Sequence, residues 1–334
     1  MSSARPAPSR RAALAVVGLV AGITTVSCGR DGDDPRGSRS GSSRGASRGP
    51  SAAADDDAVV ADPRNDLLAL DLLVGATRRR HRSLRGRLAD LQRTHRAQLA
   101  VLDPDGVAVP PARRPRVGAD PAATLASVLR EEERLQRRMV TWSVAADSGP
   151  LARLLAAIAA GTAQQVAVLA PGDATATVAA GRLEGTGRAA EPEGLDALQR
   201  VLATEHAAVW VLGSVGAATS MSATPDLFER LSGAHESHRA RRDRLAATLL
   251  AQGAEPVQSE AAYVVPDDLS SPAAAAEAAV RVERSSATAW AFLVASSTGA
   301  TRRWAAQVLT SVAVSAVGLG ADAEPLPGAG DLST

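Results

Sequence analysis

LSGAHESHRARR at residues 231–242 repeats the pattern of LADLQRTHRAQL at residues 88–99, with a His-Arg-Ala core in both stretches. A second pair follows each of them further along the chain. PAAAAEAAVRVE at residues 272–283 repeats PAATLASVLREE at residues 121–132. Because the two pairs recur in the same order with similar spacing, they indicate that one structural unit is present twice.

This repeat divides the chain into domains. We expect a first, diverged helical bundle at residues 62–170 and a second bundle at residues 194–320. The segment 171–193, rich in Gly, Ala, Thr and Glu, is interpreted as a linker. The last stretch, 321–334, contains Gly and Pro and is expected to be a flexible tail.

Composition favours an all-α fold. Aromatic residues make up only 2% of the chain, too few for a typical β-sandwich or barrel, and the dominant Ala and Leu favour helix. Asp120-Pro121, Thr224-Pro225 and Ser271-Pro272 each join a helix-capping residue to a proline suited to the first helical position. We therefore predict four helices in each unit.

Connection lengths indicate the topology. The expected connections between the first and second helices, and between the third and fourth, are short and predict antiparallel hairpins. The connections at about 103–120 and 253–271 are long in both units. One long crossover between two hairpins is the connectivity of ferritin-like bundles, so we predict two tandem ferritin-like four-helix bundles.

The N-terminus resembles an export signal. Arg10-Arg11 precedes an apolar run from Ala12 to Ile23, which is too short to span a bilayer. The run ends at TVSCG, residues 25–29, which resembles a bacterial lipobox and contains the only cysteine of the chain. We interpret residues 1–28 as a lipoprotein signal peptide of the Sec or Tat type, with Cys28 as the lipidation site.

The segment that follows the signal is polar. Residues 29–57 are Gly, Ser, Arg, Asp and Pro with almost nothing apolar, so 29–60 is expected to be a disordered linker. It would tether the folded part to the membrane. We therefore expect a lipid-anchored protein on the extracytoplasmic face of the cell membrane.

Several polar residues fall on the apolar stripes of the second unit. Glu205 shares a face with Leu198 and Leu202, and His238 lies seven residues from both Leu231 and Leu245. Further inward-facing candidates are Glu283, between Val280 and Ala287, and His235, one turn before His238. Burial without partners would be costly, so these side chains must satisfy one another or bind a metal.

The first unit carries a similar set. His95 lies on the stripe of Leu88, Leu91 and Leu99, and Glu132 lies on that of Leu125 and Leu129. Asp71 is a looser counterpart of Glu205. The first unit therefore repeats the arrangement in a weaker form.

The second unit resembles the ferritin-like domain of the DUF4439 family, an uncharacterised actinobacterial group. The resemblance covers about 194–320 and rests on these motifs: ATEHAAVW at 203–210, HESHRARRD at 235–243, QGAEP at 252–256, AAY at 261–263 and VER at 282–284. It implies a four-helix ferritin-like bundle. It implies no established activity.

A di-iron centre would require six ligands, including a Glu-x-x-His motif on two helices. Glu205, Glu283 and His238 match three of these positions. His235 stands where the second helix would carry Glu, Gln92 stands there in the first unit, and neither fourth helix has the motif. We therefore predict that no complete di-iron site is present.

Two alternatives remain open for this cluster. Glu205, His238 and Glu283, with His235 or His206, could hold one divalent metal of the Zn, Mn or Fe type. Alternatively, the three side chains form a buried network with neighbouring arginines, for which the sequence offers Arg239, Arg242 and Arg281.

The sequence argues against several function classes. We find no nucleophile elbow, P-loop, dinucleotide fingerprint or HExxH motif. The net charge of +1 argues against a nucleic-acid binder. We expect a non-catalytic structural or partner-binding lipoprotein whose partners are the membrane, through the lipid on Cys28, and an envelope protein. The alternative is a metal-binding bundle protein. The sequence leaves the oligomeric state open.

Overall fold

The computed structural model describes residues 51–171, 192–265, 269 and 271–333. The signal segment and Cys28 lie outside these residues. The described part is all-α, as predicted, and contains no strand. Its helices are α1 (Ser51–Arg80), α2 (Ala89–Leu102), α3 (Pro121–Ala145), α4 (Gly149–Leu169), α5 (Pro192–Ala217), α6 (Pro225–Ala251), α7 (Pro272–Ala295) and α8 (Gly299–Gly318), with 3₁₀ turns at Arg82–Leu84 and Gly330–Ser333.

Helices α3 and α7 begin where the sequence predicts. The carboxylate of Asp120 accepts the amide hydrogen of the third residue of α3 at 2.7 Å, and Pro121 occupies the start of this helix. At the start of α7, Ser271 Oγ accepts the amide hydrogen of the third residue of the helix at 3.1 Å, and Pro272 occupies the first helical position. Each cap satisfies one of the amides that a helix start leaves unpaired.

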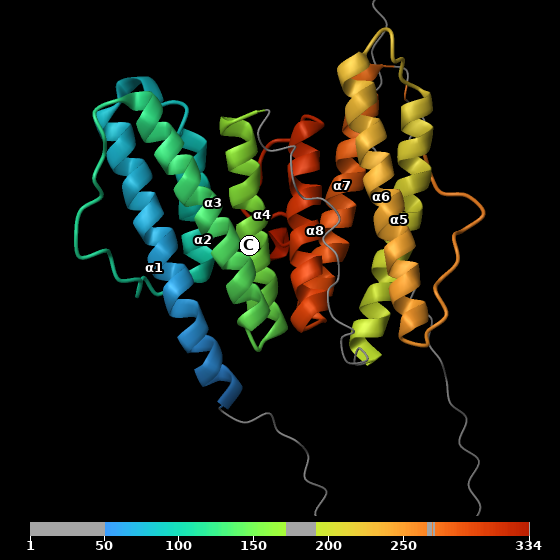
Figure 1. The fold of residues 1–334 in the computed structure, drawn as a ribbon, viewed down its shortest axis with the longest axis horizontal. Coiled ribbons are helices and arrows are strands. Elements are labelled where there is room, and N and C mark those ends of the chain that lie inside the picture. Colours follow the sequence, from blue (N-terminus) through green and yellow to red (C-terminus); the bar gives the residue numbers. More distant parts are fainter. Residues whose placement is uncertain (1–50, 172–191, 266–268, 270, 334) are drawn as a thin grey trace, which may run out of the picture. The chain divides into compact units, whose positions relative to one another are not determined.

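Helices α1–α4, the first half, and α5–α8, the second half, are connected in the same way. In each half the second and third helices are joined by a long crossover, 103–120 in the first and 252–271 in the second. The other connections within each half are short (Figure 1). This connectivity agrees with the prediction of two hairpins joined by one long crossover.

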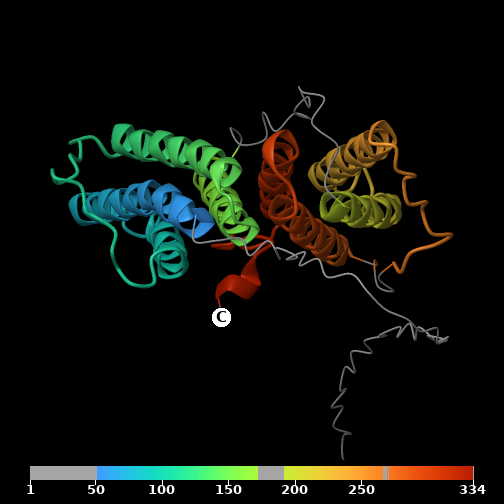
Figure 2. The same cartoon turned by 90° about the horizontal axis from the view of Figure 1, so that it is seen from below.

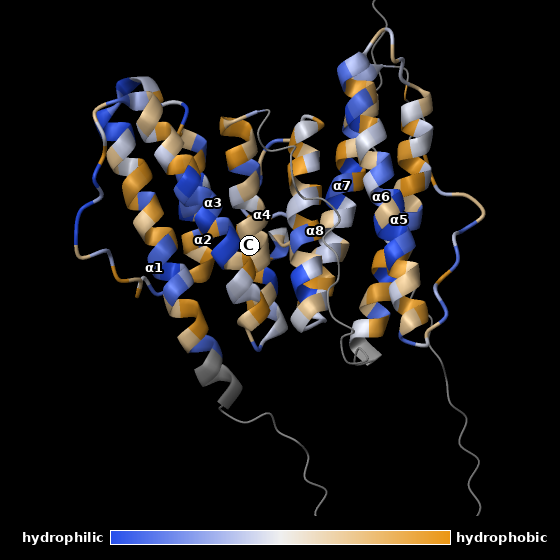
Figure 3. Ribbon diagram, in the orientation of Figure 1, coloured by the Kyte–Doolittle hydropathy of each residue, from blue (hydrophilic) through white to orange (hydrophobic). Residues whose placement is uncertain are grey.

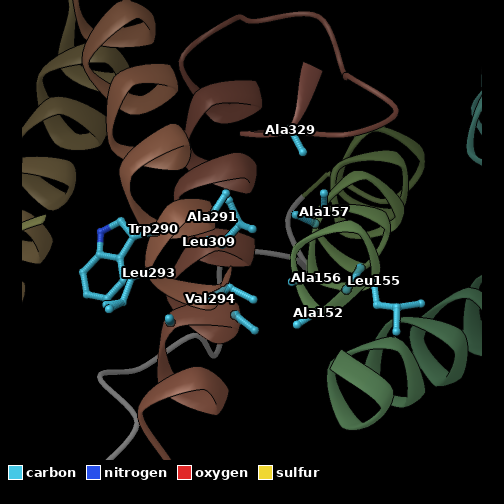
Figure 4. Close-up of a cluster of buried hydrophobic side chains, with 14 of the residues drawn as sticks. Ala152, Leu155, Ala156, Ala157, Trp290, Ala291, Leu293, Val294, Leu309 and Ala329 are labelled. Carbon is cyan, nitrogen blue, oxygen red and sulfur yellow. The ribbon is translucent and has the colours of Figure 1, made fainter. Parts of the chain in front are cut away.

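The two halves share one core. Helix α4 packs against α8 and α7, and α3 also reaches α8 (Figures 1 and 2). Buried side chains from both halves form a single hydrophobic cluster. In Figure 4 the labelled alanines of α4 lie opposite Ala291, Val294 and Leu309. Their small side chains allow the helices to approach closely, so the halves are fused rather than separate.

Helix α4 is the central helix of this core. It is coloured largely orange and white in Figure 3, in contrast to the blue-rich α6. Among the described helices, α4 alone is long and apolar enough to cross a membrane, but 67% of its apolar window is buried inside the protein. Its hydrophobicity is thus accounted for by packing against α3, α7 and α8.

The folded part begins earlier than expected. Helix α1 starts at Ser51, so the final residues of the segment 29–60 are helical rather than a disordered linker. Val60 is buried in the shared core. The apolar positions at 58–60 directly follow the acidic residues 55–57, so the start of the helix is not recognisable from hydrophobic periodicity.

The expectation of a flexible tail at 321–334 is also wrong for the described residues. Leu326 and Ala329 are buried in the shared core, and Arg153 of α4 binds Asp331 at 2.6 Å. Gly328 has a φ of 72°, and a Cβ there would overlap the carbonyl oxygen of Ala287. The C-terminal segment is thus held by the burial of Leu326 and Ala329 and by the ion pair between Asp331 and Arg153 of α4.

Candidate functional site

Three helices of the second half bring an imidazole and two carboxylates together. His238 of α6 lies between Glu205 of α5 and Glu283 of α7, and all three side chains are buried. Its Nδ1 lies 2.6 Å from Glu205 Oε2. Its Nε2 forms an ion pair with Glu283 Oε2 at 3.4 Å, without hydrogen-bond geometry. We call these three residues the triad.

Hydrogen-bond donors occupy the other carboxylate oxygens of the triad. Glu205 Oε1 accepts from Ser286 Oγ at 2.9 Å and from Trp290 Nε1 at 2.7 Å. Ser315 of α8 donates to Glu283 Oε1 at 2.5 Å. Sequence reasoning missed Ser286 and Trp290, although both lie on the face of Glu283, three and seven residues later.

The triad shifts its own protonation equilibria. Burial alone would lower the pKa of His238, but the charges of Glu205 and Glu283 and the hydrogen bond to Glu205 raise it to about 9. Burial would raise the pKa of Glu205, but His238⁺ and the charge of Arg241, with the Trp290 hydrogen bond, lower it. At neutral pH the His238 ring is therefore an imidazolium bonded to the Glu205 carboxylate.

The arginine near the triad is not one that the sequence suggested. Arg241, one turn after His238, acts on Glu205 through its charge and donates to Ser311 of α8 at 3.0 Å. Arg242 instead binds the adjacent Asp243, and Arg281 binds Glu277. For Arg239, the charge acts on His235. The predicted network exists without these three arginines.

The other two candidate ligands lie outside the triad. His235 is partly exposed and packs beside Gly213 of α5, where a Cβ would come within 3.6 Å of its Nε2. His206 is also partly exposed, and its Nε2 lies 3.2 Å from the carbonyl oxygen of Val257 in the crossover.

The first half contains a reduced version of the site. His95 Nε2 of α2 lies 3.1 Å from Glu132 Oε2 of α3, and both side chains are buried. Burial would lower the pKa of His95, but the charge and hydrogen bond of Glu132, and the charge of Asp71, raise it. Asp71 itself faces Arg96, with 3.7 Å between Oδ1 and Nε.

The donor set does not fit a resident metal. A ligating histidine needs an unprotonated ring nitrogen, whereas both nitrogens of His238 face carboxylates that favour the imidazolium. Across the described ranges, no group of three or more His, Cys, Asp or Glu side chains has an arrangement that could hold a metal ion. The triad instead has the chemistry of a buried ion network.

These features define an all-α protein in which two fused sets of four helices each enclose a buried carboxylate–histidine contact. Residues 197–331 match the model of the "domain of unknown function" DUF4439, and the chain belongs to this family. The match contains the whole triad and the docked C-terminal segment. The first half lies outside it.

The chain is similar to one solved structure in particular, that of a conserved hypothetical protein, rv2844, from Mycobacterium tuberculosis. It is 36% identical over 37% of this chain and 86% of that chain, with a TM-score of 0.34. No curated protein matches the chain.

Proposed function

We propose that this protein is a lipid-anchored, extracytoplasmic helical protein without catalytic activity, which acts through its surfaces on an envelope partner. The observation that supports the absence of catalysis is the burial of the triad, in which Glu205 and His238 are 0% exposed and Glu283 is 1% exposed. The cavity beside Glu283 has a volume of about 10 Å³, which is enough for a single water molecule and not for a substrate. The triad would then serve to fix the register of α5, α6 and α7.

The surface of the second half supports the proposal of a partner. Trp210 of α5 is 45% exposed, and Val264 of the crossover is 93% exposed. The ring of Tyr263 lies 6.2 Å from that of Trp210, so the crossover presents these side chains together with α5. Exposed aromatic and apolar residues in one place are typical of protein interfaces.

Membrane anchoring is supported by the lipobox at Cys28 and is tested by fractionation. The full chain and its Cys28→Ala variant should be expressed in an actinobacterial host and separated into membrane and soluble fractions. We expect the native protein in the membrane fraction and the variant released from it. Equal retention of both proteins would refute the lipid anchor.

The competing function is metal binding, and metal content decides between the two. The full chain should be purified from metal-supplemented medium without a histidine tag and analysed by plasma mass spectrometry, beside His238→Ala and the matched control His235→Ala. We expect no stoichiometric metal in any of the three. Near-stoichiometric metal that disappears only in His238→Ala would establish a metal site and overturn the structural role.

A further inference from the structure

The first half contains a groove between α1, α3 and the crossover 103–120, with a volume of about 650 Å³. This size lies within the range of small-molecule sites. We propose that this groove, called here the arginine groove, binds one anionic amphiphile, a molecule with a phosphate or carboxylate head and an apolar chain. The proposal goes beyond the membrane anchor and does not depend on it.

The floor of the arginine groove is apolar. Ala69, Leu70 and Leu73 of α1 face it from one side, and Leu135 of α3 from the other. Leu70 and Leu135 belong to the shared core, so the floor is rigid. An acyl chain that covers such a surface gains free energy by leaving water.

The rim of the groove is strongly basic. Five arginines line it against two carboxylates. Arg138 pairs with Asp66, and Arg134 pairs with Glu131. The remaining three, Arg113, Arg116 and Arg137, have no ion-pair or hydrogen-bond partner among the described residues.

Three guanidinium groups without ion-pair partners, beside an apolar floor, favour a ligand with an anionic head and an apolar chain. Guanidinium groups bind phosphate and carboxylate with paired hydrogen bonds, and they would attract an anion to the rim. Arg113 and Arg116 come from the crossover and Arg137 from α3, so an anionic head between them would be held from two sides. The apolar floor excludes a purely polar anion as the best fit.

The crossover that forms one wall is fixed at both ends. Asn65 Oδ1 of α1 accepts from the Val109 amide at 2.7 Å. At the other end, Arg80 Nε donates to the carbonyl oxygen of Gly118 at 2.8 Å, and His81 Nε2 lies 3.0 Å from the same oxygen. The segment with Arg113 and Arg116 spans the distance between these anchors.

Calorimetry on the full chain tests the proposal, with dodecyl phosphate below its micelle concentration as the probe. Inorganic phosphate provides the head alone and dodecyl maltoside provides a chain without charge. We expect dodecyl phosphate to bind with one-to-one stoichiometry, and each comparator to bind at least about tenfold more weakly. Equal affinity for inorganic phosphate would reduce the groove to a simple anion site and overturn the proposal.

Two variants locate the site. The triple change Arg113→Gln, Arg116→Gln and Arg137→Gln removes the free charges, and Ala69→Trp fills the floor while the charges remain. We expect each to weaken dodecyl phosphate binding about tenfold or more. The matched control replaces three exposed arginines of the second half in the same way, at Arg230, Arg239 and Arg303.

Each remaining outcome is decisive. Loss of binding in the control triple as well would mean that only net charge matters, and would refute a site in the groove. Unchanged affinity in Ala69→Trp would refute the apolar floor. Tighter binding of a polyglutamate peptide than of dodecyl phosphate would assign the arginines to an acidic protein partner instead.

Discussion

Both halves carry a buried histidine on their second helix, yet only in the second half do both ring nitrogens face carboxylates. His238 contacts Glu205 and Glu283, whereas His95 is bonded to Glu132 alone. In the first half, Asp71 is one methylene shorter than Glu205 and faces Arg96 instead.

The third helices explain this difference. Glu132, Leu135 and Met139 of α3 have the same spacing as Glu283, Ser286 and Trp290 of α7. The second half thus has two donors for the carboxylate of α5, and the first half has two apolar side chains. A buried carboxylate without donors is costly. Hydrogen-bond donors on the third helix therefore determine whether a second carboxylate can be buried beside the histidine.

The largest effect on stability is expected when the buried histidine of each half is replaced. His238→Ala leaves two buried carboxylates without their cation, so we expect the free energy of unfolding to fall by about 3–5 kcal/mol. His95→Ala leaves only Glu132 and should cost about 2 kcal/mol. The measurement is urea denaturation followed by circular dichroism.

His235→Ala serves as the control for helix α6, because this side chain is partly exposed and lies outside the triad. It should change the free energy of unfolding by about 0.5 kcal/mol or less. Equal losses in His95→Ala and His238→Ala would contradict the distinction between the two halves.

The pH dependence of stability provides the second test. The pKa of His238 is raised from 6.5 to about 9 in the folded protein, so its contribution is complete below pH 6.5 and is lost as the pH rises through 9. This amounts to about 3 kcal/mol. Glu205 acts in the opposite direction: its pKa is lowered, so its contribution is lost as the pH falls through the folded value.

Urea denaturation from pH 6 to pH 10 measures this contribution. The native protein should lose stability across that interval, and His238→Gln should show a flatter profile. His95→Gln should retain most of the native slope. The hypothesis fails if His238→Gln keeps the full native pH dependence.

The inward-facing positions of the three triad residues could be predicted from the sequence. Glu205, His238 and Glu283 lie on apolar stripes, and helical periodicity was sufficient to bring them together. The choice among arginines was not readable. Arg241 and Arg242 follow His238 by three and four residues, so both lie near its face, and only the position of α5 and α8 distinguishes them.

The ends of the folded part were harder to predict for a different reason. The C-terminal segment docks through Leu326 and Ala329, two positions that show no helical or strand periodicity. Its path also depends on the positive φ of Gly328, which is a property of the packed backbone. Tertiary contacts of this kind leave little trace in a single sequence.

The third prediction compares two buried serines. Ser286→Ala removes a hydrogen bond to the charged Glu205, and should cost about 1.5–3 kcal/mol. Ser143→Ala in the first half removes a 2.7 Å hydrogen bond to the neutral carbonyl of Ala152, and should cost about 0.5–1.5 kcal/mol.

The two variants can be separated further by the protonation of Glu205. Ser286→Ala should raise the pKa of this carboxyl, because one donor to its charged form is lost. Carboxyl carbon chemical shifts in a ¹³C-labelled protein report that change. A greater stability loss in Ser143→Ala than in Ser286→Ala would show that the charge of Glu205 is not the source of the difference.

The smallest expected effect concerns the two crossovers. Gln199 of α5 holds the second crossover by two hydrogen bonds, from its Nε2 to the carbonyl oxygen of Glu255 at 2.6 Å and from the Val257 amide to its Oε1 at 2.8 Å. The corresponding contact in the first half is the single bond from the Val109 amide to Asn65. Gln199→Ala should therefore loosen its crossover more than Asn65→Ala does.

Amide hydrogen exchange measures this difference locally. Loss of one net hydrogen bond is worth about 1 kcal/mol, so the Val257 amide should exchange on the order of fivefold faster in Gln199→Ala. The Val109 amide should respond similarly in Asn65→Ala, but the effect should extend over fewer neighbouring amides. Because both side chains lie near the surface, global stability should change little in either variant. A wider response around Val109 than around Val257 would reverse the order of the two crossovers, and would mean that the wall of the arginine groove depends on Asn65 more than the second crossover depends on Gln199.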